Sequence, residues 1–316
     1  RSTFLSINEI EKVGVVGSGL MGHGIALAFA MGGYPTTMCD TTAEILHTAM
    51  ENAAATAQLF MEEGLLTAKA MEETIGRLST TTKLEELAAS SDFVTEAIIE
   101  RSKDKRELFN KLDELCPQHA IIVSNTSSLV LSDFGSNVHR QDKIAVTHYF
   151  SPPAIVPGVE VAKGPGTSDD TYETVFELMK RIRHVPIRIN KEMPGYLLNR
   201  LQAALSREAN RLWAEGVASP EDIDLGVRST FGFRMPQEGP MMHYDLAGVW
   251  RWPIDVRIGL QSAQTQGTGE LSPEAAAKIR ARLEEGTPWF EESTSKASLE
   301  NRDRAYLRRL KSQYWD

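Results

Sequence analysis

Short runs rich in apolar residues alternate with longer amphipathic stretches along the first 190 residues of the chain. Short apolar runs are typical of buried strands, and apolar residues that recur every three or four positions are typical of helices. The pattern predicts seven strands, at residues 13–16, 35–40, 93–98, 120–124, 144–148, 159–162 and 185–189. Because strands that alternate with helices usually form parallel sheets with helices on both faces, we expect a layered α/β domain here.

Beyond residue 192 the pattern becomes almost entirely helical up to the end of the chain. Ser219-Pro220 and Ser272-Pro273 are helix start signals, since serine caps a helix and proline suits its first turn. A chain of 316 residues also exceeds the size at which one hydrophobic core usually stops growing, roughly 250 to 300 residues. We therefore expect two domains, residues 1–192 and 193–316.

A glycine-rich motif follows the first predicted strand and opens an alanine-rich helix that runs to residue 31. It reads Gly17-Ser-Gly19-Leu20-Met21-Gly22, the G-x-G-x-x-G pattern in the strand–turn–helix context of a dinucleotide site. Gly17 permits the tight turn, Gly19 lets the backbone approach a pyrophosphate, and Gly22 lets the helix pack against the strand. The alternative is a glycine-rich turn that binds nothing.

The second predicted strand ends in Asp40, about 20 residues past this motif, where a carboxylate binds the ribose 2′-hydroxyl of NAD. The same carboxylate would repel the 2′-phosphate of NADP. Thr41 and Thr42 bring no positive charge to offset that repulsion. These residues favour NAD as the cofactor.

His148 and Glu160 lie twelve residues apart, downstream of the nucleotide motif. A neutral histidine acts as a base only when its other ring nitrogen carries the proton, and a buried carboxylate that accepts this N–H fixes the tautomer. The two residues are therefore a candidate catalytic pair. A histidine at a strand end is also often structural, so the pair alone does not decide the function.

Composition narrows the range of partners. The net charge of −9 and the pI near 5.4 disfavour nucleic acid and anionic membrane surfaces. No apolar stretch reaches the length of a membrane span, and the first residues lack a basic-then-apolar signal. Cys39 and Cys116 form no metal-ligand pattern, which favours a reducing, cytoplasmic compartment and no bound metal.

Several blocks resemble the 3-hydroxyacyl-CoA dehydrogenase family, and they span most of the chain. They are residues 17–22, Glu96-Ala-Ile-Ile-Glu100, Ser124-Asn-Thr-Ser-Ser128, residues 148–160, Pro194-Gly-Tyr-Leu-Leu-Asn-Arg200 and Asp245-Leu-Ala-Gly248. The resemblance implies a Rossmann-type, doubly wound, mostly parallel sheet followed by an all-α C-terminal domain. That second domain would supply the interface of a homodimer and close the active-site cleft.

The resemblance also implies NAD-dependent oxidation of a 3-hydroxyl to the 3-oxo compound, and it implies roles for single residues. The family's catalytic pair falls on His148 and Glu160, and its substrate-contacting serine and asparagine fall on Ser127 and Asn199. The implied cofactor-binding residues are Gly17, Gly19, Leu20, Met21, Gly22, Asp40 and Ser127, with Glu100 and Lys105 near the nicotinamide ribose.

The chemistry of these positions is coherent in its own right. Ser127 lies just beyond one predicted strand and His148 ends the next, so both can point into the crevice where parallel sheets bind ligands. A hydroxyl and an imidazole in that crevice can share the proton of one secondary alcohol. Asn199, early in the second domain, can reach the same oxygen from the opposite side. Ser151 stands where many relatives have asparagine, which puts rate and specificity in doubt.

The sequence leaves two substrate classes open, a CoA thioester and a small free acid. In CoA-using members the segment after the second strand carries basic residues near the coenzyme phosphates, whereas residues 41–68 here contain no Lys or Arg. Lys69 and Arg77 are the alternative cations. Residues 199–208, 215–224 and 302–312 look similar to L-gulonate 3-dehydrogenase, the enzyme related to lambda-crystallin. The sequence thus modestly favours a free 3-hydroxy acid of the gulonate or carnitine type.

A free carboxylate substrate needs a cation, for which Arg234 and Arg251 are weak candidates beside Arg207. Trp250 and Trp252 flank Arg251 and could instead frame a quaternary ammonium. Lambda-crystallin also raises a function of another class, an abundant structural protein that keeps NAD binding.

Three helical surfaces carry further expectations. If the helices of residues 41–68 merely cover the sheet, Leu59, Phe60 and Leu65 turn inward. The last helix, roughly residues 298–312, is expected to dock on its own domain. The apolar side of this last helix carries Tyr306, Leu307 and Leu310. In an earlier helix, apolar residues at helical spacing suit either a core or a dimer interface: Leu201, Leu205, Leu212 and Trp213.

Overall fold

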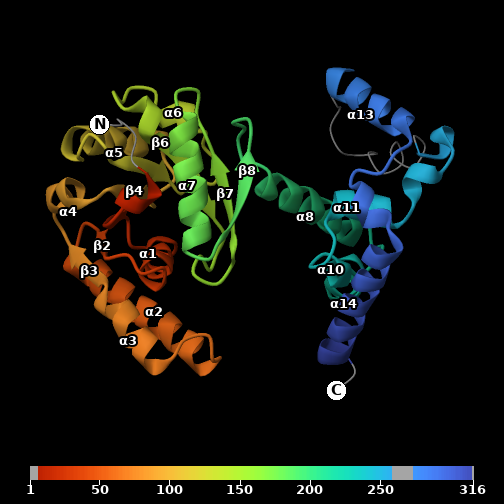
Figure 1. Cartoon of the computed structure of the whole chain (residues 1–316), viewed down its shortest axis with the longest axis horizontal. Coiled ribbons are helices and arrows are strands. Elements are labelled where there is room, and N and C mark those ends of the chain that lie inside the picture. The colour runs from red at the N-terminus through yellow and green to blue at the C-terminus, as the bar shows by residue number, and fades with distance from the viewer. Residues whose placement is uncertain (1–5, 258–272, 315–316) are drawn as a thin grey trace. The chain divides into compact units, whose positions relative to one another are not determined.

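The computed structural model of the chain describes residues 6–257 and 273–314 (Figure 1). The chain divides into two compact units, residues 1–201 and residues 202–316. The domain boundary that the sequence places near residue 192 stays a prediction. Within the described ranges, no helix is both long and apolar enough to cross a membrane.

An eight-stranded sheet forms the centre of the first unit, in the order β3-β2-β1-β4-β5-β6-β7-β8. Neighbouring strands run parallel except β6 and β7, which are antiparallel. The strands are β1 (Val13–Val16), β2 (Thr36–Cys39), β3 (Leu78–Thr81), β4 (Phe93–Glu96), β5 (Ile121–Ser124), β6 (Ile144–Tyr149), β7 (Gly158–Ala162) and β8 (Val185–Ile189).

All seven strands that the sequence predicts are present, with ends shifted by at most two residues. The prediction missed β3, which lies at one edge of the sheet beside β2. Only Leu78 of its four residues is buried, so this strand lacks the apolar run that marked the others. An edge strand of this kind is held by backbone pairing more than by apolar burial.

Helices cover both faces of the sheet. They are α1 (Gly22–Met31), α2 (Ala43–Glu62), α3 (Ala68–Gly76), α4 (Leu84–Ser90), α5 (Ser102–Leu115), α6 (Leu131–Phe134) and α7 (Asp169–Arg181), with short 3-10 helices η1 (Ile7–Glu9) and η2 (Gln141–Lys143). Alternate residues of each strand enter different apolar clusters: Val15 packs with α1 and α7, whereas Val16 packs with α4 and α5. Strands buried on both faces explain the continuous apolar runs of the sequence.

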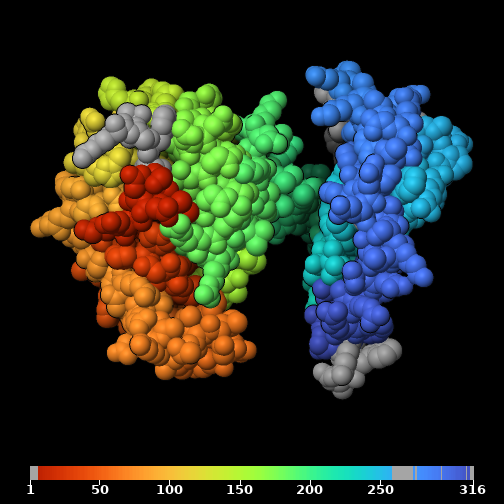
Figure 2. All heavy atoms as spheres, in the orientation of Figure 1, coloured from red at the N-terminus to blue at the C-terminus, as the bar shows by residue number. Residues whose placement is uncertain are grey.

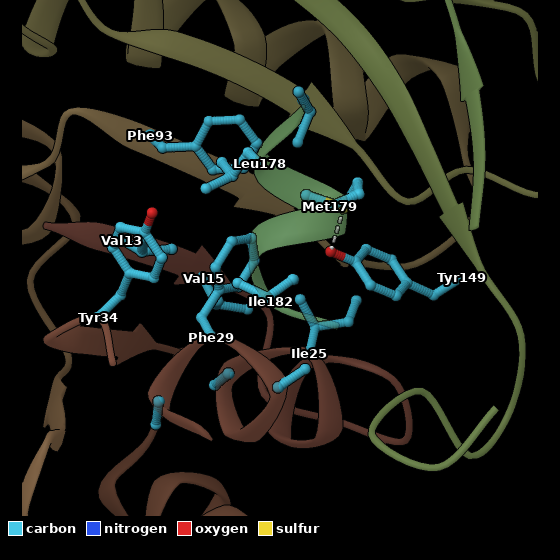
Figure 3. Packing of buried hydrophobic residues seen from close by; sticks show 14 of the residues in the cluster. Val13, Val15, Ile25, Phe29, Tyr34, Phe93, Tyr149, Leu178, Met179 and Ile182 are labelled. Carbon is cyan, nitrogen blue, oxygen red and sulfur yellow. Dashed lines mark hydrogen bonds between the residues drawn. The ribbon is translucent and has the colours of Figure 1, made fainter. Parts of the chain in front are cut away.

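Figure 3 shows part of this packing, with Phe29 of α1 near Val15 of β1 and Leu178 of α7 near Phe93 of β4. The helices α2 and α3, orange in Figure 2, contribute to the surface of the first unit. The expectation that Leu59 and Leu65 turn inward is wrong, because they are 54% and 65% exposed. Phe60 is partly buried against the core as expected. The buried stripe of α2 consists of Leu46 and three alanines, Ala49, Ala53 and Ala57.

The second unit is helical. Its elements are the larger part of α8 (Leu198–Ala214), then α9 (Pro220–Ser229), α10 (Phe231–Arg234), α11 (Pro240–Leu246), η3 (Val249–Arg251), α13 (Pro273–Glu285), η4 (Glu291–Thr294) and α14 (Lys296–Tyr314). Ser219 caps α9 as expected, because its hydroxyl accepts a hydrogen bond from the Asp222 N–H at 3.1 Å. The start signal at Ser272 lies outside the described residues.

The last helix, α14, is longer than expected and packs within the second unit. Its Tyr306 ring lies 5.9 Å from the ring of Phe233, and the Arg309 guanidinium bonds to the Phe233 carbonyl. Leu307 is 60% exposed, so its expected place on the docking side is wrong. An α/β Rossmann-type sheet followed by a helical unit confirms the predicted fold class.

Candidate active site

His148 and Glu160 face each other across the antiparallel pair β6–β7, where they are directly opposed residues. The Nδ1 of His148 lies 2.6 Å from Oε2 of Glu160, and both side chains are buried. Opposed residues on adjacent antiparallel strands bring their side chains together on one face. The twelve-residue spacing in the sequence is therefore the length of the connection that turns β6 back into β7.

Glu160 uses its second oxygen to hold the start of α8. Its Oε1 accepts hydrogen bonds from the backbone N–H groups of Leu197 at 2.9 Å and Leu198 at 2.8 Å. The positive end of a helix favours a negative charge placed there. This fully buried carboxylate therefore has a hydrogen-bond partner on each of its oxygens.

The other face of His148 is open to a pocket. The pocket has a volume of about 520 Å³, and its walls include His148, Ser127 and Asn199. The His148 ring packs 4.6 Å from Phe150 and 6.1 Å from Tyr196, measured between ring centroids. Among the described residues, Nε2 of His148 has no hydrogen-bond partner. A basic nitrogen held on one side and free on the other can exchange a proton with a bound alcohol.

Ser127 and Asn199 meet at this pocket, as the sequence analysis expects. Ser127 lies in the turn after β5, and the Nδ2 of Asn199 donates to its carbonyl at 3.2 Å. Ser151 lies on the pocket wall as well. The structure thus gathers a hydroxyl, an amide and an imidazole around one cavity within the first unit.

Glu100 organises the turn that carries Ser127. Its Oε1 accepts hydrogen bonds from the Thr126 hydroxyl at 2.6 Å and from the N–H groups of Ser127 and Ser128 at 2.9 and 2.8 Å. Burial by itself raises the pKa of Glu100, but these hydrogen bonds and the Lys105 ammonium lower it to about 2. Glu100 also lines the pocket, so a fixed negative charge lies at its wall.

Lys105 is only 1% exposed, a burial that the sequence pattern does not predict. Its Nζ lies 2.6 Å from Oε1 of Glu96 and 3.1 Å from Oε2 of Glu100. Burial raises the pKa of Glu96, although Lys105 and the Ser124 hydroxyl act against that rise. Lys105 supports Glu100 from the interior, and its contact with a nicotinamide ribose stays a prediction.

The glycine motif forms a loop with space for a dinucleotide. Gly17 has φ of +91°, and a Cβ there would lie 2.6 Å from the Ala97 carbonyl oxygen. A Cβ on Gly22 would lie 1.7 Å from the Gly17 carbonyl oxygen. At Gly19, by contrast, a Cβ would meet no described atom within 4 Å. Protein packing therefore demands glycine at positions 17 and 22 but not at position 19, where the close approach of a pyrophosphate stays a prediction.

Asp40 joins this loop to the end of β2. Its Oδ2 accepts from the Ser18 N–H and its Oδ1 from the Thr41 N–H, both at 2.7 Å. The carboxylate is only partly buried, so its remaining lone pairs can accept ribose hydroxyls. Leu20 and Met21 lie on the pocket wall between this loop and His148. The loop, Asp40 and the open side at Gly19 together fit NAD.

Asn125, which the sequence does not single out, also shapes the pocket. The Oδ1 of Asn125 accepts the Tyr149 N–H at 2.9 Å, which ties the end of β5 to the end of β6 beside His148. Asn125 also lines the pocket. The signal was present, because Asn125 lies inside the Ser-rich block that follows the strand.

The candidate arginines for a substrate carboxylate lie in the second unit. The Nε of Arg234 is 3.9 Å from Oε1 of the buried Glu238. Arg251 stacks over the Trp250 ring at 4.6 Å. Each guanidinium thus has a neighbour within its own unit, and a contact with substrate stays a prediction for both.

Comparisons with known proteins agree with this geometry. The model of the 3-hydroxyacyl-CoA dehydrogenase NAD binding domain matches residues 12–193, and that of the C-terminal domain matches residues 195–267. The human mitochondrial hydroxyacyl-coenzyme A dehydrogenase is 36% identical over 245 residues, which are 76% of this chain and 77% of that protein.

Two further proteins are similar to this chain. The human lambda-crystallin homolog is 32% identical over 238 residues, 74% of this chain and 75% of that protein. A solved diketoreductase, described as a catalyst for dicarbonyl compounds, has a TM-score of 0.66 at 28% identity. That similarity covers 87% of this chain and 92% of the diketoreductase.

Proposed function

The chain belongs to the 3-hydroxyacyl-CoA dehydrogenase family of NAD-dependent oxidoreductases that act on a CH–OH group, and we propose that His148 and Glu160 are its catalytic pair. The reaction is oxidation of the 3-hydroxyl of a 3-hydroxy acid to the 3-oxo compound. The observation that carries this proposal is the 2.6 Å contact between Nδ1 of His148 and Glu160, with His148 on the wall of the pocket.

In this proposal His148 removes the hydroxyl proton with Nε2 while its Nδ1–H stays bonded to Glu160. Glu160 stabilises the imidazolium that forms and keeps the ring in the productive tautomer. NAD, when bound, would supply the hydride acceptor for C3 of the substrate. In the reverse direction, Nε2 returns the proton to the 3-oxo group.

Ser127 and Asn199 position the reacting oxygen. Both line the pocket with His148, and the Asn199 side chain already contacts the Ser127 carbonyl. A hydroxyl and an amide can each donate to the substrate oxygen as charge develops there. Glu100 holds the Ser127 turn in place, since its carboxylate accepts hydrogen bonds from Thr126, Ser127 and Ser128.

For the substrate we propose a small free 3-hydroxy acid. The exposed side of α2 carries Glu44, Glu51 and Glu62, and residues 41–68 bring no cation for a polyphosphate tail. The nearby cations have other neighbours: Lys69 lies 3.8 Å from Glu73, and Arg77 bonds to the Ala30 carbonyl. The diketoreductase relative, whose description names dicarbonyl compounds, supports a substrate without CoA.

A CoA thioester is the second candidate. It is favoured by the names of curated relatives, among them the human hydroxyacyl-coenzyme A dehydrogenase, and by the 470 Å³ cavity beside α2 and α3. That cavity has apolar walls at Phe60 and Ile155 and guanidinium groups at Arg77 and Arg183. A coenzyme tail placed there would meet two cations rather than none.

The deciding experiment measures NADH formation with L-3-hydroxybutyryl-CoA and with free 3-hydroxybutyrate, L-gulonate and L-carnitine. We expect turnover with a free acid and little with the thioester. Turnover with the thioester alone would overturn the free-acid proposal while keeping the reaction. No turnover with any of them, with NADH still bound, would favour a structural role like that of lambda-crystallin.

We also propose a homodimer in the cytoplasm. Three large apolar side chains of the second unit are exposed to solvent. Leu205 is 43% exposed, Trp213 55% and Leu225 62%. Exposed apolar side chains of this size are typical of surfaces that another subunit covers. Light scattering at micromolar concentration should give twice the 35.0 kDa chain mass. A monomer mass would contradict the proposal.

A further inference from the structure

Tyr196 has a backbone conformation that bulky residues rarely adopt. Its φ is +46°, and the preceding Gly195 has φ of +77°. Glycine reaches this left-handed region without strain, whereas a tyrosine pays a steric cost for it. Such a conformation persists only where the surrounding contacts determine it.

The turn directs two backbone donors at Glu160. The N–H of Tyr196 closes the turn on the Met193 carbonyl at 3.0 Å, and the next two N–H groups, of Leu197 and Leu198, bond to Oε1 of Glu160. The left-handed residue is therefore the step that turns the chain from the Met193 turn into α8. Without it these two donors would not both face the carboxylate.

The side chain of Tyr196 contacts the other parts of the site. It is 1% exposed, and its ring centroid lies 6.1 Å from that of His148. Its hydroxyl donates to the Leu129 carbonyl at 2.8 Å, at the end of the turn that carries Ser127. One residue thus touches His148 with its ring, the Ser127 turn with its hydroxyl, and Glu160 through the backbone that follows it.

We propose that Tyr196 is a positioning residue that fixes His148, Glu160 and the Ser127 turn relative to one another. The inference rests on the proposed roles of His148, Glu160 and Ser127. Core filling alone explains the burial of the ring. It does not explain a strained backbone or a hydroxyl anchored to the turn that carries Ser127.

Tyr196→Phe keeps the ring and removes the anchor on Leu129. We expect kcat to fall about fivefold, the effect of one net hydrogen bond, with the dissociation constant of NADH unchanged. The matched control is Tyr172→Phe, because Tyr172 is a buried tyrosine whose hydroxyl also donates to a backbone carbonyl, that of Val161. The control should lower the melting temperature without changing kcat.

Tyr196→Gly relieves the backbone strain but removes the ring. We expect kcat to fall on the order of 10²-fold, because misplacement by about 1 Å costs that much. In full-length protein labelled with ¹⁵N-histidine, the share of His148 that carries its proton on Nε2 should rise. Tyr196→Phe should leave that tautomer share as in the wild type, since it keeps the ring and the turn.

Two results would overturn the inference. One is a tautomer share in Tyr196→Gly equal to that of the wild type. The other is a Tyr196→Phe variant that loses only thermal stability, as the Tyr172→Phe control does. The tautomer measurement needs no substrate, so it tests Tyr196 even if every 3-hydroxy acid fails and the proposed reaction is wrong.

Discussion

The carboxylate of Glu160 accepts the backbone N–H of Leu198 at 2.8 Å while its other oxygen holds the Nδ1 of His148 at 2.6 Å. One buried carboxylate therefore joins the candidate base to the first turn of α8. A structural ion pair would need only the histidine. The backbone donors on Oε1 keep the carboxylate from rotating, so the orientation of the imidazole is fixed by the fold.

Replacement of Glu160 by glutamine should separate charge from shape. The amide oxygen of Glu160→Gln still accepts from Leu197 and Leu198, which directs its NH₂ group at Nδ1 of His148. An NH₂ group can only donate, so the imidazole proton moves to Nε2 and the base is lost. We expect kcat to fall about 10²–10⁴-fold and the acid limb of the pH–rate profile to change.

The control for this variant is Glu173→Gln, which removes an exposed carboxylate paired with Arg188 in the same unit. Exposed pairs of this kind contribute little, so its rate and profile should match the wild type. An unaltered pH–rate profile in Glu160→Gln would reduce Glu160 to a structural role.

His148→Ala removes the base itself. The loss should be about 10²-fold or more in kcat, because general base catalysis contributes about 10²–10⁴-fold. The glycine loop and Asp40 lie on other strands, so NADH should bind nearly as tightly as before. Steady-state kinetics measures the loss in kcat, and fluorescence titration measures the affinity for NADH. A loss below about tenfold would remove His148 from the proposed mechanism.

The sequence indicated the candidate catalytic pair because the signal for that pair is local. Twelve residues between His148 and Glu160 suit two adjacent strands and their connection, and side-chain chemistry supplied the rest. The backbone of Tyr196 had no such signal, since tyrosine is among the residues least suited to a positive φ. Only tertiary contacts select that conformation.

Burial of charge was equally hard to predict. Lys105 is a type of residue that is almost never fully buried unless it is paired, and its partners Glu96 and Glu100 come from a neighbouring strand and loop. The prediction that Leu59 and Leu65 turn inward was wrong for a different reason, since both are exposed. Helix periodicity marks apolar positions, but alanines set the buried stripe of α2, and small residues give a weak hydrophobic signal.

The glycine loop offers a matched pair of substitutions. In Gly22→Ala the new Cβ would lie 1.7 Å from the Gly17 carbonyl oxygen, so the loop must deform. We expect a loss of about 1–3 kcal/mol in the free energy of unfolding together with loss of NADH binding. In Gly19→Ala the Cβ enters open space, so the melting temperature should equal that of the wild type.

Gly19→Ala should nevertheless weaken NADH about tenfold or more, a change of about 1.4 kcal/mol, because its methyl group occupies the approach of the pyrophosphate. Thermal melts and fluorescence titration on both variants test this contrast. Equal NADH affinity in Gly19→Ala and the wild type would place the pyrophosphate elsewhere.

Glu100 gives the site a pH dependence whose sign follows from its pKa. The pKa is lowered from 4.5 to about 2, since hydrogen bonds from Thr126 and Ser128 and the Lys105 ammonium outweigh the effect of burial. A carboxyl whose pKa is depressed by folding stabilises the folded state above its unfolded pKa. This contribution is complete above about pH 4.5 and is lost as the pH falls toward about 2.

Glu100→Gln should therefore destabilise the protein most at neutral pH, because the amide cannot reproduce the charge that holds the Ser127 turn. The difference in free energy of unfolding between variant and wild type should narrow as the pH falls from about 4.5 toward 2. Urea denaturation across this range measures it, with Glu63→Gln, an exposed carboxylate at the end of α2, as the control. A constant difference at every pH would mean that shape, and not the charge of Glu100, holds the turn on which Ser127 depends.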